Sequence, residues 1–333
     1  MNLFKKYKAI AYLPTPYTLL QYYLLEPYRI EDTLFFIHER FPRDISSRMK
    51  NTFCLLGGSY IKRYYSFLII GYYFLRNRNI PVFLGGDLAY TNLFLFRFTT
   101  IFYLEDGTGS YVFVNQKDKQ MVHKKESNWS RWLWGDIYPC WGLAQNVKSI
   151  YLTGILPIPE IIAEKVKLID LNYLWEQKSP EQKRKIWHLF MPEDFDMHLI
   201  NNYETVLITQ PFSEYSDGFF SEADKIEIYH RLLTGYPESK ILIKTHPAET
   251  TDYSHYFPSA CILTCVCPME LLLFSGLHPR RIVTVDSTAA FHFDDSVEKI
   301  IAGYGVTPAL AKEAKRRGIS DEKLDNYITK QSK

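Results

Sequence analysis

Two adjacent carboxylates and a flexible turn stand out as groups that could do chemistry. The apolar residues 101–104 predict a buried strand, which ends at Glu105 and Asp106 and leads into Gly107. A carboxylate at such a position can act as a general base, and a glycine lets a ligand approach the backbone closely. Open α/β sheets bind their ligands just outside the carboxyl ends of their strands. Taken alone, these three residues also fit an ordinary polar turn after a strand.

A histidine in the second half of the chain offers a partner for a leaving phosphate. His246 lies between the predicted strand 240–244 and Pro247, whose ring fixes the turn and aims the imidazole outward. A histidine with a pKa near neutral can protonate a phosphate or donate a hydrogen bond to it. A purely structural histidine is the alternative.

Further polar groups of the second half could bind an anion or a nucleoside. Ser287 and Thr288 follow the predicted strand 281–285, and hydroxyls with free N–H groups at a helix N-terminus form an anion site. Simple helix capping is the alternative. Glu270 follows Pro268 in an apolar helix, where it either interacts with the helix dipole or binds a ribose or base. The polar window from Gln210 to Glu214 follows another predicted strand.

The elements that must position these residues alternate between strands and helices. We expect strands at 8–13, 33–37, 51–56, 81–84, 98–104, 205–209, 240–244, 261–266 and 281–285. Helices are expected at 17–25, 61–76 and 221–234, after Pro268, and in the charged sequence 306–333. Strands that alternate with helices form parallel sheets. The sequence therefore predicts an α/β fold of two Rossmann-like domains that face each other across a cleft lined by the polar strand ends.

The expected domains are unequal in length. Residues 1–200 are predicted to form an acceptor-side Rossmann-like domain with a linking region, residues 201–300 a nucleotide-binding Rossmann-like domain, and residues 301–333 a charged helical tail. The stretch 123–200 contains the tryptophans at 129, 132, 134 and 141, and we expect it to link and pack the two halves. Within it, the polar residues 176–185 predict an exposed helix.

The composition fits a folded protein and excludes several classes. With 333 residues, 47% hydrophobic content and a net charge of +2, the chain can form a large core and shows no sign of a nucleic-acid partner. Cys261, Cys265 and Cys267 lie in a strand-like segment without the paired spacing of a zinc site, so we expect no metal. Five cysteines, an odd number, argue against a secreted disulfide scaffold, and no signal peptide is visible. We therefore expect a cytoplasmic protein.

One apolar window raises the question of a membrane. Residues 64–75 are too few to span a bilayer, which takes about 20 residues. A buried helix is the favoured interpretation of this window, and a membrane-facing surface is the alternative. Lys5, Lys6 and Lys8 could touch an anionic lipid surface, so a peripheral contact with the inner membrane stays open.

Other catalytic motifs are missing from the sequence. It contains no GxxxxGK[ST] phosphate loop, no GxGxxG after the first strand, no GxSxG and no HExxH. Two carboxylates would also suit a glycoside hydrolase. Two successive Rossmann-like halves favour an enzyme that uses a sugar nucleotide.

Six segments, in this order, resemble the bacterial sialyltransferases of glycosyltransferase family 52. They are TPYTLLQ (15–21), LEDGTGSY (104–111), LITQPFSE (207–214), IKTHPAE (243–249), CPMELLL (267–273) and VDSTAAF (285–291). The resemblance implies a GT-B architecture and the transfer of sialic acid from CMP-sialic acid to a galactose-terminated glycan, a lipooligosaccharide or capsule precursor. It also implies inversion at the anomeric carbon, no metal and no cofactor beyond the donor substrate, and it makes a homodimer an open possibility.

The same resemblance implies roles for individual residues. His246 would contact the CMP phosphate and act as an acid, Ser287 and Thr288 would bind that phosphate, and Glu270 would meet the ribose or cytosine. The base would be Asp106 or a carboxylate in the window QPFSEYSD, where Phe212 stands at the expected aspartate and Glu214 follows two residues later. The choice between Asp106 and Glu214 stays open. The flanking residues counted as substrate- or nucleotide-binding are Glu105, Gly107, Thr209, Gln210 and Pro247.

Two other functions compete with this interpretation. A related transferase could use another nucleotide sugar and transfer a hexose. A protein with the same fold could also bind glycans or another partner without catalysis, which an abundance of surface tyrosine and tryptophan would suit.

Overall fold

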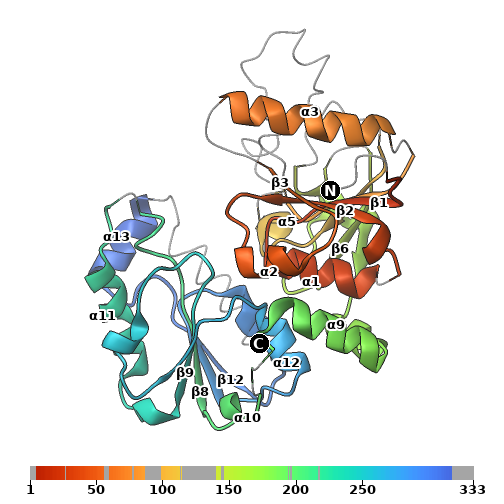
Figure 1. The fold of residues 1–333 in the computed structure, drawn as a ribbon. Helices are drawn as coiled ribbons and strands as arrows, with labels where there is room; N and C mark the ends of the chain where they lie inside the picture. Colours follow the sequence, from red (N-terminus) through yellow and green to blue (C-terminus); the bar gives the residue numbers. More distant parts are fainter. Residues whose placement is uncertain are drawn as a thin grey trace. The chain divides into compact units, whose positions relative to one another are not determined.

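The computed structural model divides into two compact units, Met1–Phe190 and Met191–Lys333 (Figure 1). It describes residues 5–26, 28–55, 60–76, 79–86, 99–112, 114, 140–143, 146–193, 195, 197–216 and 218–316. Each unit is built on a parallel sheet, as the alternation of strands and helices predicts. The tryptophans at 129, 132 and 134 and residues 317–333 lie outside the described residues.

The first unit contains a seven-stranded sheet with the order β3-β2-β1-β4-β5-β6-β7. Its strands are β1 (Ala9–Tyr12), β2 (Thr33–His38), β3 (Thr52–Leu55), β4 (Val82–Leu84), β5 (Ile101–Leu104), β6 (Val147–Leu152) and β7 (Val166–Leu168). Its α-helices are α1 (Pro16–Leu25), α2 (Arg43–Arg48), α3 (Tyr60–Arg76), α5 (Gly109–Val112), α8 (Leu171–Glu176) and α9 (Pro180–Phe190). The order of the strands reverses between β1 and β4, which is where open sheets of this kind bind ligands.

Aromatic residues fix helices α1 and α3 on opposite faces of this sheet. Neighbouring residues of a strand point to opposite faces, and in β2 the ring of Phe35 packs against Tyr22 of α1 at 5.6 Å between centroids. The next residue, Phe36, packs against Tyr73 of α3 at 6.4 Å. Helix α1 therefore covers one face and α3 the other (Figure 1).

The second unit contains a five-stranded parallel sheet with the order β10-β9-β8-β11-β12. Its strands are β8 (Thr205–Ile208), β9 (Ile241–Lys244), β10 (Cys261–Leu263), β11 (Arg281–Thr284) and β12 (Glu298–Ile301). Its α-helices are α10 (Met197–Ile200), α11 (Glu222–Leu233), α12 (Met269–Phe274) and α13 (Pro308–Arg316). The order of the strands reverses between β8 and β11, so this unit also has a switch point at the carboxyl edge of its sheet.

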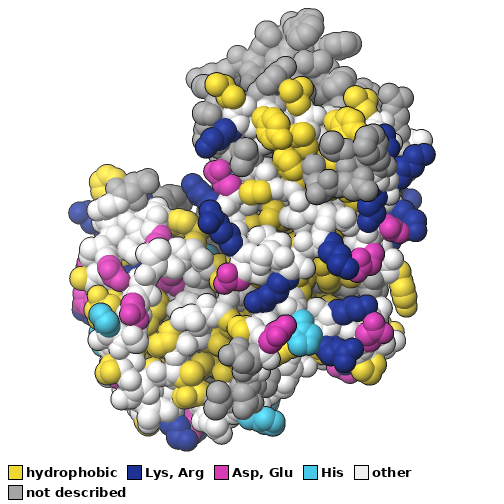
Figure 2. Space-filling view, viewed as in Figure 1, with side chains coloured by type: hydrophobic (Ala, Val, Ile, Leu, Met, Phe, Trp, Pro, Cys, Tyr) yellow, Lys and Arg dark blue, Asp and Glu magenta, His cyan; other side chains and the backbone are white. Residues whose placement is uncertain are grey.

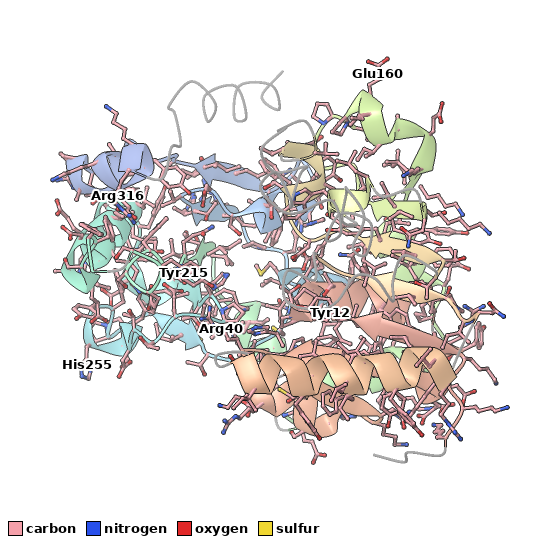
Figure 3. All side chains as sticks on the ribbon, turned by 90° about the horizontal axis from the view of Figure 1, so that it is seen from above. Tyr12, Arg40, Glu160, Tyr215, His255 and Arg316 are labelled. Carbon is pink, nitrogen blue, oxygen red and sulfur yellow. The ribbon has the colours of Figure 1, made fainter. Side chains whose placement is uncertain are left out.

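Helices α11 and α13 close the core of the second unit. Tyr229 of α11 and Leu310 of α13 are buried with Leu207 of β8 and Val283 of β11. Arg316, at the end of α13, lies over the ring of Phe219 at 4.7 Å and ties this helix to the loop after β8 (Figure 3). The helix within the predicted charged tail is thus part of the second unit's core.

Several elements differ from the prediction. Strands β6, β7 and β12 were not predicted, and the single helix expected at 176–185 is interrupted. Helix α8 ends at Glu176, and α9 begins at Pro180 after Ser179, whose hydroxyl accepts from the Gln182 N–H at 3.2 Å. The segment after Ser287 is a 3₁₀ helix, Thr288–His292, where an ordinary helix start was expected. Within the described ranges, no helix combines the length and hydropathy needed to cross a membrane.

Candidate active site

Asp106 lies among the carboxyl ends of three neighbouring strands of the first unit. It follows β5, and its Oδ1 is 3.4 Å from the hydroxyl of Thr15, which follows β1 and caps helix α1. Gly86 follows β4, and a Cβ built on it would lie 3.2 Å from Oδ2 of Asp106 and 3.2 Å from the ring of Pro14. The carboxylate is partly buried. The fold therefore places Asp106 beside the switch point between β1 and β4.

Glu105, next to Asp106 in the sequence, has no exposed surface. Its carboxylate accepts from the hydroxyls of Tyr17 (2.8 Å) and Tyr111 (2.6 Å). Thr153 donates to it from both its N–H (2.7 Å) and its hydroxyl (2.8 Å). The side-chain amide of Gln21 binds the backbone of Glu105. It donates to the Glu105 carbonyl at 2.7 Å and accepts from the Glu105 N–H at 3.2 Å. We infer that Glu105 ties α1, α5 and the loop after β6 together and so positions Asp106.

Two glycines shape the turn that follows Asp106. Gly107 has a φ of 58°, in the left-handed region that favours glycine. At Gly109 a Cβ would lie 1.9 Å from the ring of Trp141, so the indole packs directly on the backbone there. The flexible turn expected from the sequence is in fact closely packed on one side.

His246 of the second unit is held as a neutral imidazole. Its Nδ1 accepts a hydrogen bond from the N–H of Ala248 at 3.1 Å, so the proton of the neutral ring is on Nε2. Burial lowers the pKa of His246 to about 4; the Lys244 ammonium acts in the same direction, and Glu214 opposes them. At neutral pH the ring therefore has one N–H donor, on Nε2.

Glu249 anchors the turn that carries His246, and the sequence reasoning did not single it out. Its side chain is almost fully buried, and it accepts from the N–H of His246 at 2.8 Å and from the hydroxyl of Tyr253 at 2.5 Å. The hydroxyl of Thr209, at the end of β8, donates to the same carboxylate. The acid three residues after the histidine in IKTHPAE was the available signal. Glu249 thus connects the ends of β8 and β9.

Glu214 is engaged in a buried ion pair. Lys225 of α11 is fully buried, and its Nζ lies 2.8 Å from Glu214 and 3.4 Å from Glu249. Glu214 also accepts from the N–H of Thr250 at 3.0 Å. Burial raises the pKa of Glu214, but the Lys225 ammonium and the Thr250 N–H more than offset this, so the pKa is lowered. Phe212, two residues earlier, is buried in the hydrophobic core.

The loop after β8 is held by its backbone. The N–H of Gln210 donates to the hydroxyl of Tyr229 at 2.6 Å, and Thr209 is buried. Burial raises the pKa of Tyr229 well above its usual range, so this phenol stays protonated. Pro247, in contrast, is exposed at the edge of the sheet.

Three predicted binding residues follow β10 and β11. Ser287 precedes the 3₁₀ helix, and its side chain makes no capping hydrogen bond, although its N–H donates to the Thr284 hydroxyl at 3.2 Å. Ser287 and Thr288 are both partly exposed. Glu270, in the first turn of α12, is buried and lies 3.2 Å from Nε2 of His292. The structure thus pairs Glu270 with a histidine that the sequence reasoning did not consider.

Each unit therefore gathers its own candidate residues at the carboxyl edge of its sheet. In the first unit these are Asp106 and its neighbours Thr15 and Gly86. The second unit carries His246 after β9 and Ser287 and Thr288 after β11, and both strands are neighbours of β8. Two Rossmann-like sheets with polar groups at their switch points are suited to binding a nucleotide and a second substrate.

Comparisons with known proteins agree with this architecture. The model of glycosyltransferase family 52 matches residues 74–310. An uncharacterised protein of Haemophilus influenzae is 32% identical over 255 residues, which are 76% of this chain and 78% of that protein.

Two solved structures are similar in fold. The first is a 2,6-sialyltransferase of Photobacterium sp. JT-ISH-224 in a ternary complex with CMP and lactose, with a TM-score of 0.59 and 12% identity over 95% of this chain and 77% of that one. The second is the GT-B domain of a Photobacterium damselae sialyltransferase, with a TM-score of 0.51 and 13% identity over 95% and 98% of the two chains. The predicted α/β, GT-B-like fold is confirmed, and the chain belongs to glycosyltransferase family 52.

Proposed function

We propose that this protein transfers sialic acid from CMP-sialic acid to a galactose-terminated glycan, a lipooligosaccharide or capsule precursor. The observation that carries the proposal is the state of His246. It is a neutral imidazole whose ring N–H is on Nε2, and it lies at the carboxyl edge of the second unit's parallel sheet. Membership of family 52 supports it, as does the likeness in fold to an enzyme solved with CMP and lactose. A cytoplasmic location and a homodimer stay predictions.

The second unit would stabilise the leaving group. When the bond between the anomeric carbon and the phosphate oxygen breaks, its electron pair goes to that oxygen, and CMP leaves with added negative charge. The Nε2–H of His246 and the hydroxyls of Ser287 and Thr288 are suited to donating hydrogen bonds to this charge. Because the pKa of His246 is lowered to about 4, the ring of the free protein is neutral at neutral pH and presents its Nε2–H. We therefore assign His246 a hydrogen bond from Nε2 to the leaving phosphate.

The first unit would supply the base. Asp106 is partly buried at the switch point, within reach of a ligand, and can accept the proton of the acceptor hydroxyl as that oxygen bonds to the anomeric carbon. Glu214 is a poorer candidate because its lone pairs are used by Lys225, Thr250 and Ser213 and its pKa is lowered. We therefore favour Asp106, with Glu214 in a structural role. Attack from the face opposite CMP would invert the anomeric centre, without a metal ion.

The test is a transfer assay with the full chain and radiolabelled CMP-sialic acid, with lactose or N-acetyllactosamine as acceptor and UDP-hexoses in parallel. We expect a sialylated product, CMP release that depends on the acceptor, and no loss of activity with EDTA. If the protein transfers a hexose from a UDP-hexose and no sialic acid from CMP-sialic acid, it is a hexosyltransferase and the proposal is wrong. A melting shift with CMP and no product from any donor would favour the non-catalytic glycan-binding protein.

A further inference from the structure

Helix α3 has an apolar side that the sheet does not cover. One side packs on the first unit's sheet, where Ile70 and Tyr73 are buried. On the other side Ile61 is 82% exposed and Leu75 is 58% exposed. The sequence favoured a fully buried helix at residues 64–75, and this is wrong for the outer side of α3. The helix is apolar on two sides, and one face of a sheet can bury only one of them.

The exposed residues form one continuous stripe along the whole helix. Its members, called the α3 stripe here, recur at intervals of four and three residues, so they fall on the same face. They are Ile61, Tyr65, Leu68, Tyr72 and Leu75, all exposed by 40% or more. At about 1.5 Å per residue, the stripe is about 21 Å long. Hydrophobic side chains gather along α3 in the space-filling view (Figure 2).

The charged residues within α3 itself are all basic. The sequence of α3 contains three basic residues and no acidic one, and the exposed Lys62 and Arg76 lie near its two ends. The ring of Tyr7 contacts that of Tyr73 at 5.9 Å, which places the basic N-terminal segment beside the last turns of α3. In that segment Lys6 is exposed, whereas Lys8 pairs with Asp32 at 2.7 Å.

This charge pattern distinguishes between two ways of covering the stripe. Apolar residues at alternating intervals of four and three could pair two copies of α3, as in a coiled coil. Such a pair would bring together basic helices without an acid on either to compensate. An anionic lipid surface is complementary to both features, because it accepts apolar side chains at the boundary of headgroups and acyl chains and attracts lysine and arginine.

We propose that α3 binds the surface of an anionic phospholipid bilayer, with the α3 stripe buried at the headgroup boundary and Lys62, Arg76 and Lys6 near the lipid phosphates. The helix lies in the plane of the membrane and does not cross it. Tyr65 and Tyr72 suit this position, since a phenol places an apolar ring in the boundary and a hydroxyl in water. The proposal does not depend on the enzymatic reaction.

The test is flotation of the purified full chain with vesicles of phosphatidylcholine alone and of phosphatidylcholine with 30% phosphatidylglycerol. We expect binding to the anionic vesicles only. The double variant Ile61→Ser, Leu75→Ser should lower the partition coefficient about tenfold or more, because both side chains leave the apolar boundary. Arg76→Gln should lower it about fivefold. The variant Ile61→Ser, Leu75→Ser should keep the melting temperature of the wild type, since both side chains are exposed.

A matched control tests whether the position on α3 matters. Ile161 and Leu168 belong to the same unit and are 56% and 64% exposed, so Ile161→Ser, Leu168→Ser removes the same residue types away from the stripe. This control should bind vesicles like the wild type. An equal loss in the control, or no binding of the wild type to anionic vesicles, overturns the proposal. A lipid-free dimer that the stripe variant converts to a monomer, without vesicle binding, would assign the stripe to a second copy of the chain.

Discussion

The protonation of His246 gives a prediction for stability against pH. Its pKa is about 4 in the folded protein and about 6.5 in an unfolded chain, so folding favours the neutral ring. The contribution of the neutral His246 ring to the free energy of unfolding is complete above pH 6.5, and it is lost as the pH falls towards 4. Between pH 7 and 4.5 the wild type should therefore lose about 2 kcal/mol more unfolding free energy than His246→Gln, which cannot titrate. Urea unfolding followed by circular dichroism at both pH values measures this, and equal losses would contradict it.

The two carboxylates proposed as the base should respond differently to amide substitution. Asp106→Asn keeps the size of the side chain but removes the base, so kcat should fall about 100-fold or more at an unchanged melting temperature. Glu214→Gln leaves the fully buried Lys225 with a weakened partner. Its main effect should be a loss of about 3 kcal/mol in the free energy of unfolding.

A double variant separates the structural role of Glu214 from a catalytic one. Glu214→Gln with Lys225→Met removes the pair of Glu214 and Lys225, while Glu249, 3.4 Å from the Lys225 Nζ, keeps its hydrogen bonds from the His246 N–H and the Tyr253 hydroxyl. Exchanging a buried ion pair for uncharged side chains is often nearly neutral for stability. The double variant should recover most of the lost stability and, if Glu214 only positions the loop, most of the turnover. Stable protein without turnover in the double variant, together with an active Asp106→Asn, would make Glu214 the base.

At the scale of an element, the turn from Asp106 to α5 depends on a close contact. A Cβ on Gly109 would overlap the Trp141 ring, so Gly109→Ala must displace the indole or the turn. We expect a loss of about 2 kcal/mol in unfolding free energy and a lower kcat, because Asp106 lies three residues earlier. Gly305→Ala is the control, since a Cβ there meets nothing within 4 Å. Equal stability of the two variants in thermal melts would show that Trp141 does not hold the turn.

The sequence predicts some elements well because they carry their own local signals. Ser221 begins α11 as expected, with its hydroxyl accepting from the Asp224 N–H and Asp224 accepting from the Ser221 N–H in return. Strands such as β8 and β9 are short apolar runs bounded by polar turns. In contrast, β7 has only three residues, Val166–Leu168, and they are mostly exposed, so its strand state depends on pairing with β6. A strand that forms because it pairs with another strand has no local sequence pattern by which it could be predicted.

The candidate site was predictable to a similar extent. The strand ends with Asp106, His246 and Ser287 were found because polar residues after apolar runs are a local signal. The difference between Glu105 and Asp106, adjacent acids with opposite environments, comes from Tyr17, Tyr111 and Thr153, which are distant in sequence. The ion pair of Glu214 with Lys225 is likewise a long-range contact. Burial of an acid could not be predicted without those partners.

At the scale of the whole molecule, the proposed reaction assigns the two substrates to different units. The residues proposed to contact the donor, His246, Ser287 and Thr288, belong to the second unit, and the proposed base Asp106 belongs to the first. CMP should therefore slow hydrogen exchange of the full chain in the turns 209–214, 245–250 and 286–292. The turn 105–112 should exchange at the same rate with and without CMP, because the proposed contacts to the CMP phosphate, His246, Ser287 and Thr288, all belong to the second unit.

Addition of the acceptor should then complete the pattern. With CMP present, lactose should slow exchange in residues 85–86 and 105–112, since the acceptor hydroxyl must reach Asp106 for its proton to be removed. Asp106→Asn is the control, because it keeps the size of the side chain and should retain protection by CMP in the second unit. Protection of 105–112 by CMP alone would move the nucleotide to the first unit and reverse the assignment, since each turn follows the strands of only one sheet.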